Sequence, residues 1–221
     1  MKINYEDLKL LLNVITVVAG CLGEVMGYII VALIAIVIVI ELIRGDYARP
    51  FFPDEYLDGT YVIDFEKLYQ EGKRGVIFDI DNTLVMHNYP ADDRAKLLMK
   101  RLEEIGYKIV FLSNNKEPRV KQFRDDALKS AQYIYKAGKP KRSGYIKACN
   151  IMGTDISNTL FVGDQLFTDV WGAKRSGICN ILVKPIDKKE EIQIVLKRKL
   201  EAIVLFYYKR SKQFDCSSHK K

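Results

Sequence analysis

The chain has 221 residues, enough for one ordinary domain and an appendage, and a hydrophobic content of 48% suits a packed core. Its four cysteines show no paired spacing and its two histidines are too few for a histidine-based metal site, which excludes a disulfide framework and a zinc site. The formal net charge is +7, and from residue 184 onward 11 Lys or Arg stand against 5 Asp or Glu. A basic end of this kind suits nucleic acid, anionic lipid or plain solubility.

The first 44 residues are dominated by a long apolar run. Residues 10–40 include one charged residue, and the part from Val25 to Ile43 is long enough to cross a bilayer, which needs about 20 residues. A cleaved signal peptide is the alternative. Such a peptide begins with a positively charged region, and the acidic residues Glu6 and Asp7 argue against one here. We therefore expect residues 1–44 to form a retained membrane anchor, as one transmembrane helix or a helical hairpin. Beside an anchor, lipid rather than nucleic acid is the expected partner of the basic end.

Residues 45–74 are expected to form a linker and a short helix. The segment Gly45–Glu55 is rich in proline and aromatic residues and cannot be regular helix throughout. Its aromatic side chains either lie among lipid headgroups or pack on the domain that follows, and both remain open. Asp64–Gly72 then reads as a short helix that leads into the first strand of that domain.

The stretch from Gly75 to Val85 is the chemical centre of the sequence. It reads as a buried strand that ends in Asp79 and Asp81, which share a face by the two-residue period of a strand, followed by Thr83. Like charges at a strand end are destabilising unless a cation or a shared proton compensates. We expect a divalent metal there, with Asp79 as a nucleophile toward phosphorus and Asp81 as general acid and base. Taken alone, a pair of solvated turn acids explains the pattern equally well.

Three later stretches place further polar residues after strands of their own. These residues are Ser113 with Asn114, Lys139, and Asp164 with Asp169. A serine hydroxyl donates to a phosphate oxygen, and a lysine adds three donors and a full charge. The two later aspartates can face the first pair across the crevice at the carboxyl ends of parallel strands. Taken alone, each residue can be explained by a structural role, such as a helix cap or a solvated cation. Taken together, they predict a phosphate-binding site.

From residue 75 onward, strands alternate with helices of about a dozen residues. This order predicts an α/β fold, a Rossmann-like parallel sheet covered on both faces. No large insertion follows the first strand or separates Ser113 from Lys139. We expect this domain to cover residues 75–210, and residues 211–221 to form a disordered basic tail.

The segment from Ile192 to Tyr208 mixes apolar and basic residues. An amphipathic helix resting on an anionic surface has this composition. A final helix that packs on the sheet and exposes a solvated basic face has it too. Both interpretations stay open at this point.

Together, these stretches resemble the four motifs of the haloacid dehalogenase (HAD) phosphohydrolases over about residues 50 to 200. Within that superfamily, five strings are similar to the YqeG-like subfamily IIIA, which is related to the mitochondrial phosphatidylglycerophosphate phosphatases. The strings are FPD at 52–54, FDIDNTLV at 78–85, SNN at 113–115, YKAGKP at 135–140 and GDQLFTD at 163–169. The resemblance implies a capless HAD fold and a phosphomonoester hydrolase that uses Mg²⁺. The long apolar amino terminus departs from the usual soluble form.

The resemblance also implies a role for each candidate residue. Catalysis falls to Asp79 and Asp81, phosphate binding to Thr83, Ser113, Asn114 and Lys139, and metal binding to Asp79, Asp81, Asp164 and Asp169. The expected substrate is phosphatidylglycerophosphate, hydrolysed by a membrane-anchored enzyme whose catalytic domain faces the cytoplasm. A phosphatase for a soluble phosphometabolite or phosphoprotein, and a membrane scaffold without catalysis, are the alternatives.

Overall fold

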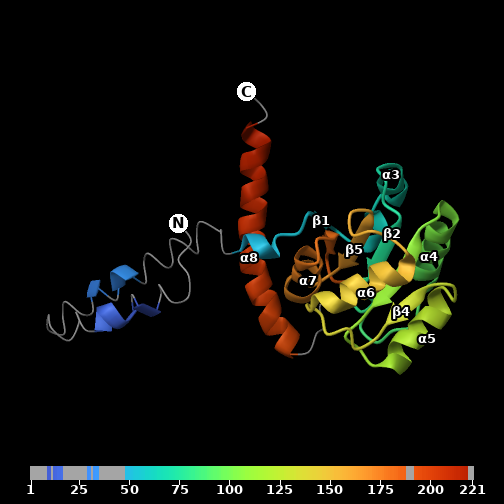
Figure 1. Ribbon diagram of the computed structural model, residues 1–221, viewed down its shortest axis with the longest axis horizontal. Helices are drawn as coiled ribbons and strands as arrows, with labels where there is room; N and C mark the ends of the chain where they lie inside the picture. Colours follow the sequence, from blue (N-terminus) through green and yellow to red (C-terminus); the bar gives the residue numbers. More distant parts are fainter. Residues whose placement is uncertain are drawn as a thin grey trace. The chain divides into compact units, whose positions relative to one another are not determined.

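A computed structural model describes residues 9–10, 12–16, 29–30, 32–34, 48–187 and 192–218. The chain divides into two compact units, Met1–Arg49 and Pro50–Lys221. The predicted membrane anchor over residues 1–44 lies mostly outside the described residues, and within them no helix combines the length and the apolar character that a bilayer crossing needs. The second unit carries the sheet and the site (Figure 1).

Six parallel strands form one sheet in the order β1-β6-β5-β2-β3-β4. The strands are β1 (Glu55–Leu57), β2 (Gly75–Phe78), β3 (Lys108–Leu112), β4 (Gln132–Ile134), β5 (Thr159–Gly163) and β6 (Cys179–Val183). The apolar run of β2 is buried at every position, as expected for a strand flanked by two others and covered on both faces. The predicted α/β fold with a parallel sheet is confirmed.

Helices cover the two faces of the sheet. They are α3 (Phe65–Gln70), α4 (Asp93–Ile105), α5 (Glu117–Ala127), α6 (Arg142–Met152), α7 (Trp171–Arg175) and α8 (Ile192–Ser218), with short turns η1 (Arg49–Phe51) and η2 (Thr60–Val62) and a π-helical turn η3 (Leu166–Val170). Alternate residues of β2 point to opposite faces. Phe78 packs in a core with α4 and α5, whereas Ile77 packs with α6 and α7.

Local signals set the ends of the helices. The Asp92 carboxylate caps α4 by accepting a hydrogen bond from the Ala95 N–H at 2.8 Å. Gly106 ends the same helix in the left-handed conformation, at φ 107°, which glycine adopts readily. The turn at Gly106 leads the chain directly into β3.

Two parts of the second unit differ from the sequence-based prediction. Residues 55–57, predicted as linker, form the edge strand β1, and the Asp54 carboxylate before it accepts hydrogen bonds from the Asn180 backbone and side chain at 2.9 and 2.7 Å. At the other end, α8 continues to Ser218, through most of the predicted disordered tail. A strand of three half-exposed residues gives no periodic signal, which explains why β1 escapes prediction.

Candidate active site

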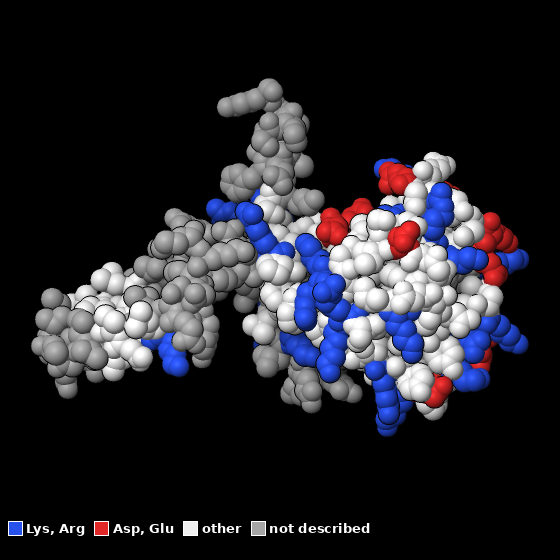
Figure 2. Space-filling view, viewed as in Figure 1, with Lys and Arg blue, Asp and Glu red and all other residues white. Residues whose placement is uncertain are grey.

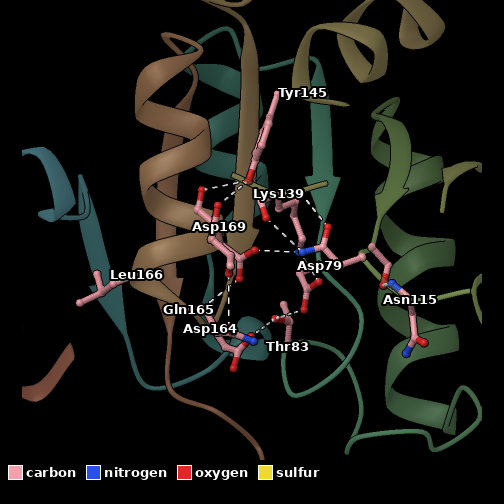
Figure 3. A network of polar contacts seen from close by, with 12 residues as sticks. Asp79, Thr83, Asn115, Lys139, Tyr145, Asp164, Gln165, Leu166 and Asp169 are labelled. Carbon is pink, nitrogen blue, oxygen red and sulfur yellow. Dashed lines mark hydrogen bonds and ion pairs between the residues drawn. The ribbon is translucent and has the colours of Figure 1, made fainter. Parts of the chain in front are cut away.

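Four buried ionisable side chains meet at the carboxyl edge of the sheet (Figure 3). Asp79 follows β2, Asp164 follows β5, Asp169 lies in η3 and Lys139 precedes α6. They come together because parallel strands end at the same edge of a sheet. Each is at most 8% exposed, so their charges interact with little screening by water.

Lys139 and Thr83 connect the three carboxylates. The Lys139 ammonium lies 2.5 Å from the Asp79 Oδ1 atom and 2.7 Å from the Asp169 Oδ1 atom. The Thr83 hydroxyl lies 3.2 Å from Asp79 Oδ2 and 3.3 Å from Asp164 Oδ1, so it can donate to either carboxylate. Asp79 is therefore held from both sides, and its orientation is fixed before any substrate binds.

The three aspartates have the geometry of a metal-binding group. One carboxylate oxygen from each of Asp79, Asp164 and Asp169 lies within 4.8 Å of the other two. Carboxylate oxygens are the donors that a hard cation such as Mg²⁺ prefers. The residues present thus fit the predicted ion, with Asp79, Asp164 and Asp169 as its holders.

Asp81 lies outside that group, although the sequence predicts it as a fourth metal ligand. Its carboxylate accepts hydrogen bonds from the Arg119 guanidinium at 2.8 Å, the Asn88 N–H at 2.8 Å and the Asn115 side chain at 3.2 Å. Burial acts to raise the pKa of Asp81, but these hydrogen bonds outweigh it and hold the pKa below its ordinary value. Among the described residues, the group that could hold a metal ion is therefore Asp79, Asp164 and Asp169, and Asp81 is held as a carboxylate by its own hydrogen-bond partners.

The predicted phosphate-binding residues divide into two kinds. Lys139 and Thr83 lie in the carboxylate cluster itself. Asn114 instead fixes the backbone of Lys139, because its side chain accepts from the Lys139 N–H at 2.7 Å and donates to the Lys139 carbonyl at 3.2 Å. The buried Ser113 hydroxyl accepts from the Asn115 N–H at 3.1 Å, and the Asn115 side chain in turn donates to Asp81.

Comparison with known proteins decides the family. The sequence family described as haloacid dehalogenase-like hydrolase matches residues 85–177. A Bacillus subtilis protein named "Probable phosphatase YqeG" is 35% identical over 161 residues, which cover 72% of this chain and 92% of that protein. This chain belongs to the YqeG-like HAD phosphatases. The family predicted from the motifs is confirmed, and so is the class of enzyme.

Two further proteins are similar to this YqeG-like phosphatase at greater distance. The Arabidopsis thaliana protein named "Phosphatidylglycerophosphate phosphatase 1, chloroplastic/mitochondrial" is 28% identical over 158 residues, 65% of this chain and 44% of that protein. The chain thus spans less than half the length of this relative. The cobalt-bound deoxy-D-mannose-octulosonate 8-phosphate phosphatase of Haemophilus influenzae aligns with a TM-score of 0.43 and 16% identity, over 67% of this chain and 95% of that one.

Helix α8 contributes two residues to the site of the YqeG-like phosphatase that sequence reasoning missed. The Arg198 guanidinium forms an ion pair with the Asp164 carboxylate and also donates to the Asp164 carbonyl at 2.6 Å. The Glu201 carboxylate accepts a hydrogen bond from the Arg198 guanidinium at 2.9 Å and another from the Leu166 N–H at 2.7 Å. An Arg and a Glu three residues apart on a helix are common on protein surfaces, so the sequence carried no signal for this role.

The charges within the YqeG-like site do not balance. Three buried carboxylates face two buried or half-buried cations, Lys139 and Arg198. Burial, opposed by Lys139 and reinforced by Asp169, raises the pKa of Asp79 to about 7. Burial likewise raises the pKa of Asp164 well above its ordinary value. A bound dication would supply the missing positive charge.

Proposed function

We propose that this YqeG-like phosphatase is a Mg²⁺-dependent phosphomonoester hydrolase that works through an aspartyl-phosphate at Asp79. The observation that supports this most is the buried Asp79 carboxylate, which Lys139 and Thr83 orient beside two further aspartates at the edge of the sheet. Because this carboxylate has little contact with solvent and is held in one orientation, it is well placed to act as a nucleophile.

In the first step, an oxygen of Asp79 attacks the phosphorus atom of the bound ester. The new bond joins the carboxylate oxygen to phosphorus, and the bond from phosphorus to the ester oxygen breaks. Asp81 first takes up a proton from solvent and then gives it to the leaving oxygen. Lys139 and Ser113 supply positive charge and a hydroxyl donor to the phosphoryl oxygens. Asp79, Asp164 and Asp169 would hold Mg²⁺, which would neutralise charge on the phosphoryl group.

In the second step, water releases the phosphate. Asp81, now a carboxylate, takes a proton from a water molecule, whose oxygen attacks phosphorus and breaks its bond to Asp79. Inorganic phosphate leaves and Asp79 returns to its starting form. The hydrogen bonds from Arg119 and Asn115 favour the ionised Asp81 that this step requires.

The substrate we propose is phosphatidylglycerophosphate, converted to phosphatidylglycerol at a membrane. Two observations support a lipid. The similarity to the Arabidopsis phosphatidylglycerophosphate phosphatase covers 65% of this chain. In addition, only residues 79–92 connect β2 to α4, so no large cap is present there to close over a substrate. We further propose that residues 1–44 anchor the enzyme with its catalytic domain facing the cytoplasm.

Replacement of Asp79 tests the mechanism. Asp79→Asn keeps the size of the side chain but removes the nucleophilic charge, so we expect kcat for any phosphate monoester to fall by about 10⁴-fold or more. Circular dichroism and thermal unfolding should show a folded protein. Asp93→Asn, which changes an exposed acid on α4, should keep full activity. Retained turnover in Asp79→Asn would rule out the mechanism.

The substrate is tested by comparing esters on the same preparation. With Mg²⁺ present, kcat/KM should be higher for micellar phosphatidylglycerophosphate than for soluble phosphate monoesters or phosphopeptides. Equal or better turnover of a soluble ester would overturn the lipid assignment while leaving the phosphatase chemistry intact. A wild-type protein inactive on every ester at saturating Mg²⁺ would instead indicate a scaffold.

A further inference from the structure

Helix α8 has an inner face that fixes it to the domain. Arg198 and Glu201 reach Asp164 and the Leu166 N–H, as described above. One turn further on, Leu205 packs with the buried cluster of Leu166 and Leu182. The rotation of α8 about its own axis is therefore set by its contacts with the active-site edge of the sheet.

The opposite face of α8 combines apolar and basic side chains. Spacings of four, three and four residues place four of them on one stripe of the helix: Lys199, Ile203, Phe206 and Arg210. Ile203 is 56% exposed and Phe206 61% exposed, and Leu200 beside them is 53% exposed. We call these five residues the outer face of α8.

The exposed charges in residues 197–211 of α8 are all positive. Between residues 197 and 211 the exposed charged side chains are Lys197, Lys199, Lys209 and Arg210. The one carboxylate in that span, Glu201, is 4% exposed and paired with Arg198 on the inner face. Lys and Arg side chains gather on and beside α8 in Figure 2.

We propose that the outer face of α8 docks on the surface of an anionic phospholipid bilayer. Apolar side chains of an interfacial helix enter the boundary between headgroups and acyl chains, while Lys and Arg reach the anionic phosphates. A second copy of this chain would bring the same cations against one another. A nucleic acid would leave the exposed Leu200, Ile203 and Phe206 without an apolar partner.

Docking at this face would hold the active site one helix diameter, roughly 10 Å, from the lipid layer. Asp164 and Arg198 line a cavity of about 100 Å³ between α8 and the end of β6, and the exposed Ala202 also borders it. The same helix thus forms one wall of the site and the surface that meets the membrane. This role in presenting a lipid phosphate rests on the proposed function, whereas the docking itself does not require that substrate.

Tryptophan quenching in the full chain tests the docking. The chain has one tryptophan, Trp171, so Phe206→Trp in a Trp171→Phe background places a single reporter on the outer face. The protein is reconstituted into nanodiscs of phosphatidylcholine, with or without phosphatidylserine, that carry brominated or plain acyl chains. Bromine quenches a tryptophan only when the ring lies in the membrane.

We expect quenching of the reporter in Phe206→Trp that increases with phosphatidylserine and decreases with added salt, because salt screens exposed charges. Adding Lys199→Gln and Arg210→Gln should shift the equilibrium between docked and undocked helix about 30-fold toward the undocked form. Ile203→Trp provides an independent reporter on the same face, should the first variant fail to fold. Leu97→Trp, on an equally exposed position of α4, is the control and should not be quenched.

Absence of bromine quenching in both Phe206→Trp and Ile203→Trp in anionic discs would overturn the proposal. So would a blue shift of their emission that depends on protein concentration and not on lipid, since this indicates a second copy as the partner. The discs contain no phosphate monoester substrate, so the result is independent of turnover. The docking and the proposed lipid phosphatase activity can therefore fail separately.

Discussion

At the scale of single residues, the site depends on close packing around Asp169. Its carboxylate accepts from the Gln165 N–H at 3.0 Å as well as from Lys139, and the Tyr145 hydroxyl donates to the neighbouring Thr168 carbonyl at 2.8 Å. Glycine makes this approach possible. A Cβ atom at Gly163 would lie 2.6 Å from the Asp169 Oδ2 atom, closer than two such atoms can approach. Position 163, directly before Asp164, therefore requires glycine.

The same argument predicts the effect of Gly172→Ala. An added Cβ would overlap the ring of Tyr145, which is fully buried and cannot move aside. Because Tyr145 supports the turn that carries Asp169, we expect a loss of about 1–3 kcal/mol in the free energy of unfolding and weaker Mg²⁺ binding. Urea unfolding and a Mg²⁺ titration measure both. Gly59→Ala, where an added Cβ meets no atom within 4 Å, is the matched control; equal behaviour of the two variants would contradict this account.

At the scale of secondary-structure elements, α8 completes the site. The Arg198 side chain is 20% exposed and the Asp164 side chain is fully buried, so their ion pair is far less screened than a surface pair. Removing one partner of a buried pair leaves an uncompensated charge. The stability of the domain is thus tied to the docking of this helix.

This arrangement predicts a large effect of Arg198→Gln. The free energy of unfolding without metal should fall by about 3 kcal/mol or more, because Asp164 stays buried without its cation. Added Mg²⁺ should raise the melting temperature more in the variant than in the wild type, since the ion replaces part of the lost charge. Arg101→Gln, which breaks an exposed pair with Glu66 on α3, should cost less than about 1 kcal/mol. A cost for Arg198→Gln as small as this would contradict the role given to Arg198.

The elements also show what sequence patterns can and cannot predict. The parallel sheet follows from apolar runs that end in polar residues, and the site residues after those runs meet because strand ends share an edge. The direction of the Asp81 side chain was not predictable, because it depends on Arg119 of α5, which lies 38 residues further along the chain. Arg198 was missed for the same reason, since a contact between distant elements leaves no local pattern.

At the scale of the whole molecule, the buried cluster couples folding to pH and metal. Burial raises the pKa of Asp79 from 3.8 to about 7, so the folded protein binds more protons than the unfolded chain between these values. Without metal, the contribution of this group to stability therefore falls as the pH rises through that window. Metal binding acts in the opposite sense, because the ion requires ionised carboxylates.

We accordingly predict that stabilisation by Mg²⁺ depends on pH. The rise in melting temperature on adding Mg²⁺ should be small at about pH 5 and larger at about pH 8, where the three carboxylates are more readily ionised. In Asp79→Asn, which lacks one titrating ligand, both the rise and its pH dependence should be smaller. Calorimetry on the two proteins with and without Mg²⁺ measures this. Equal stabilisation of the wild type at both pH values would count against a carboxylate metal site.

The central claim is that phosphate passes through Asp79, and trapping the intermediate tests it most directly. Full-length protein is mixed with Mg²⁺ and radiolabelled phosphatidylglycerophosphate, quenched in acid within one turnover, and digested for peptide mapping. We predict a covalent label on the peptide that contains Asp79, which disappears on continued incubation and is absent from Asp79→Asn. A wild-type enzyme that releases phosphate with no label on this peptide, or an Asp79→Asn variant that becomes labelled and turns over, would contradict the account.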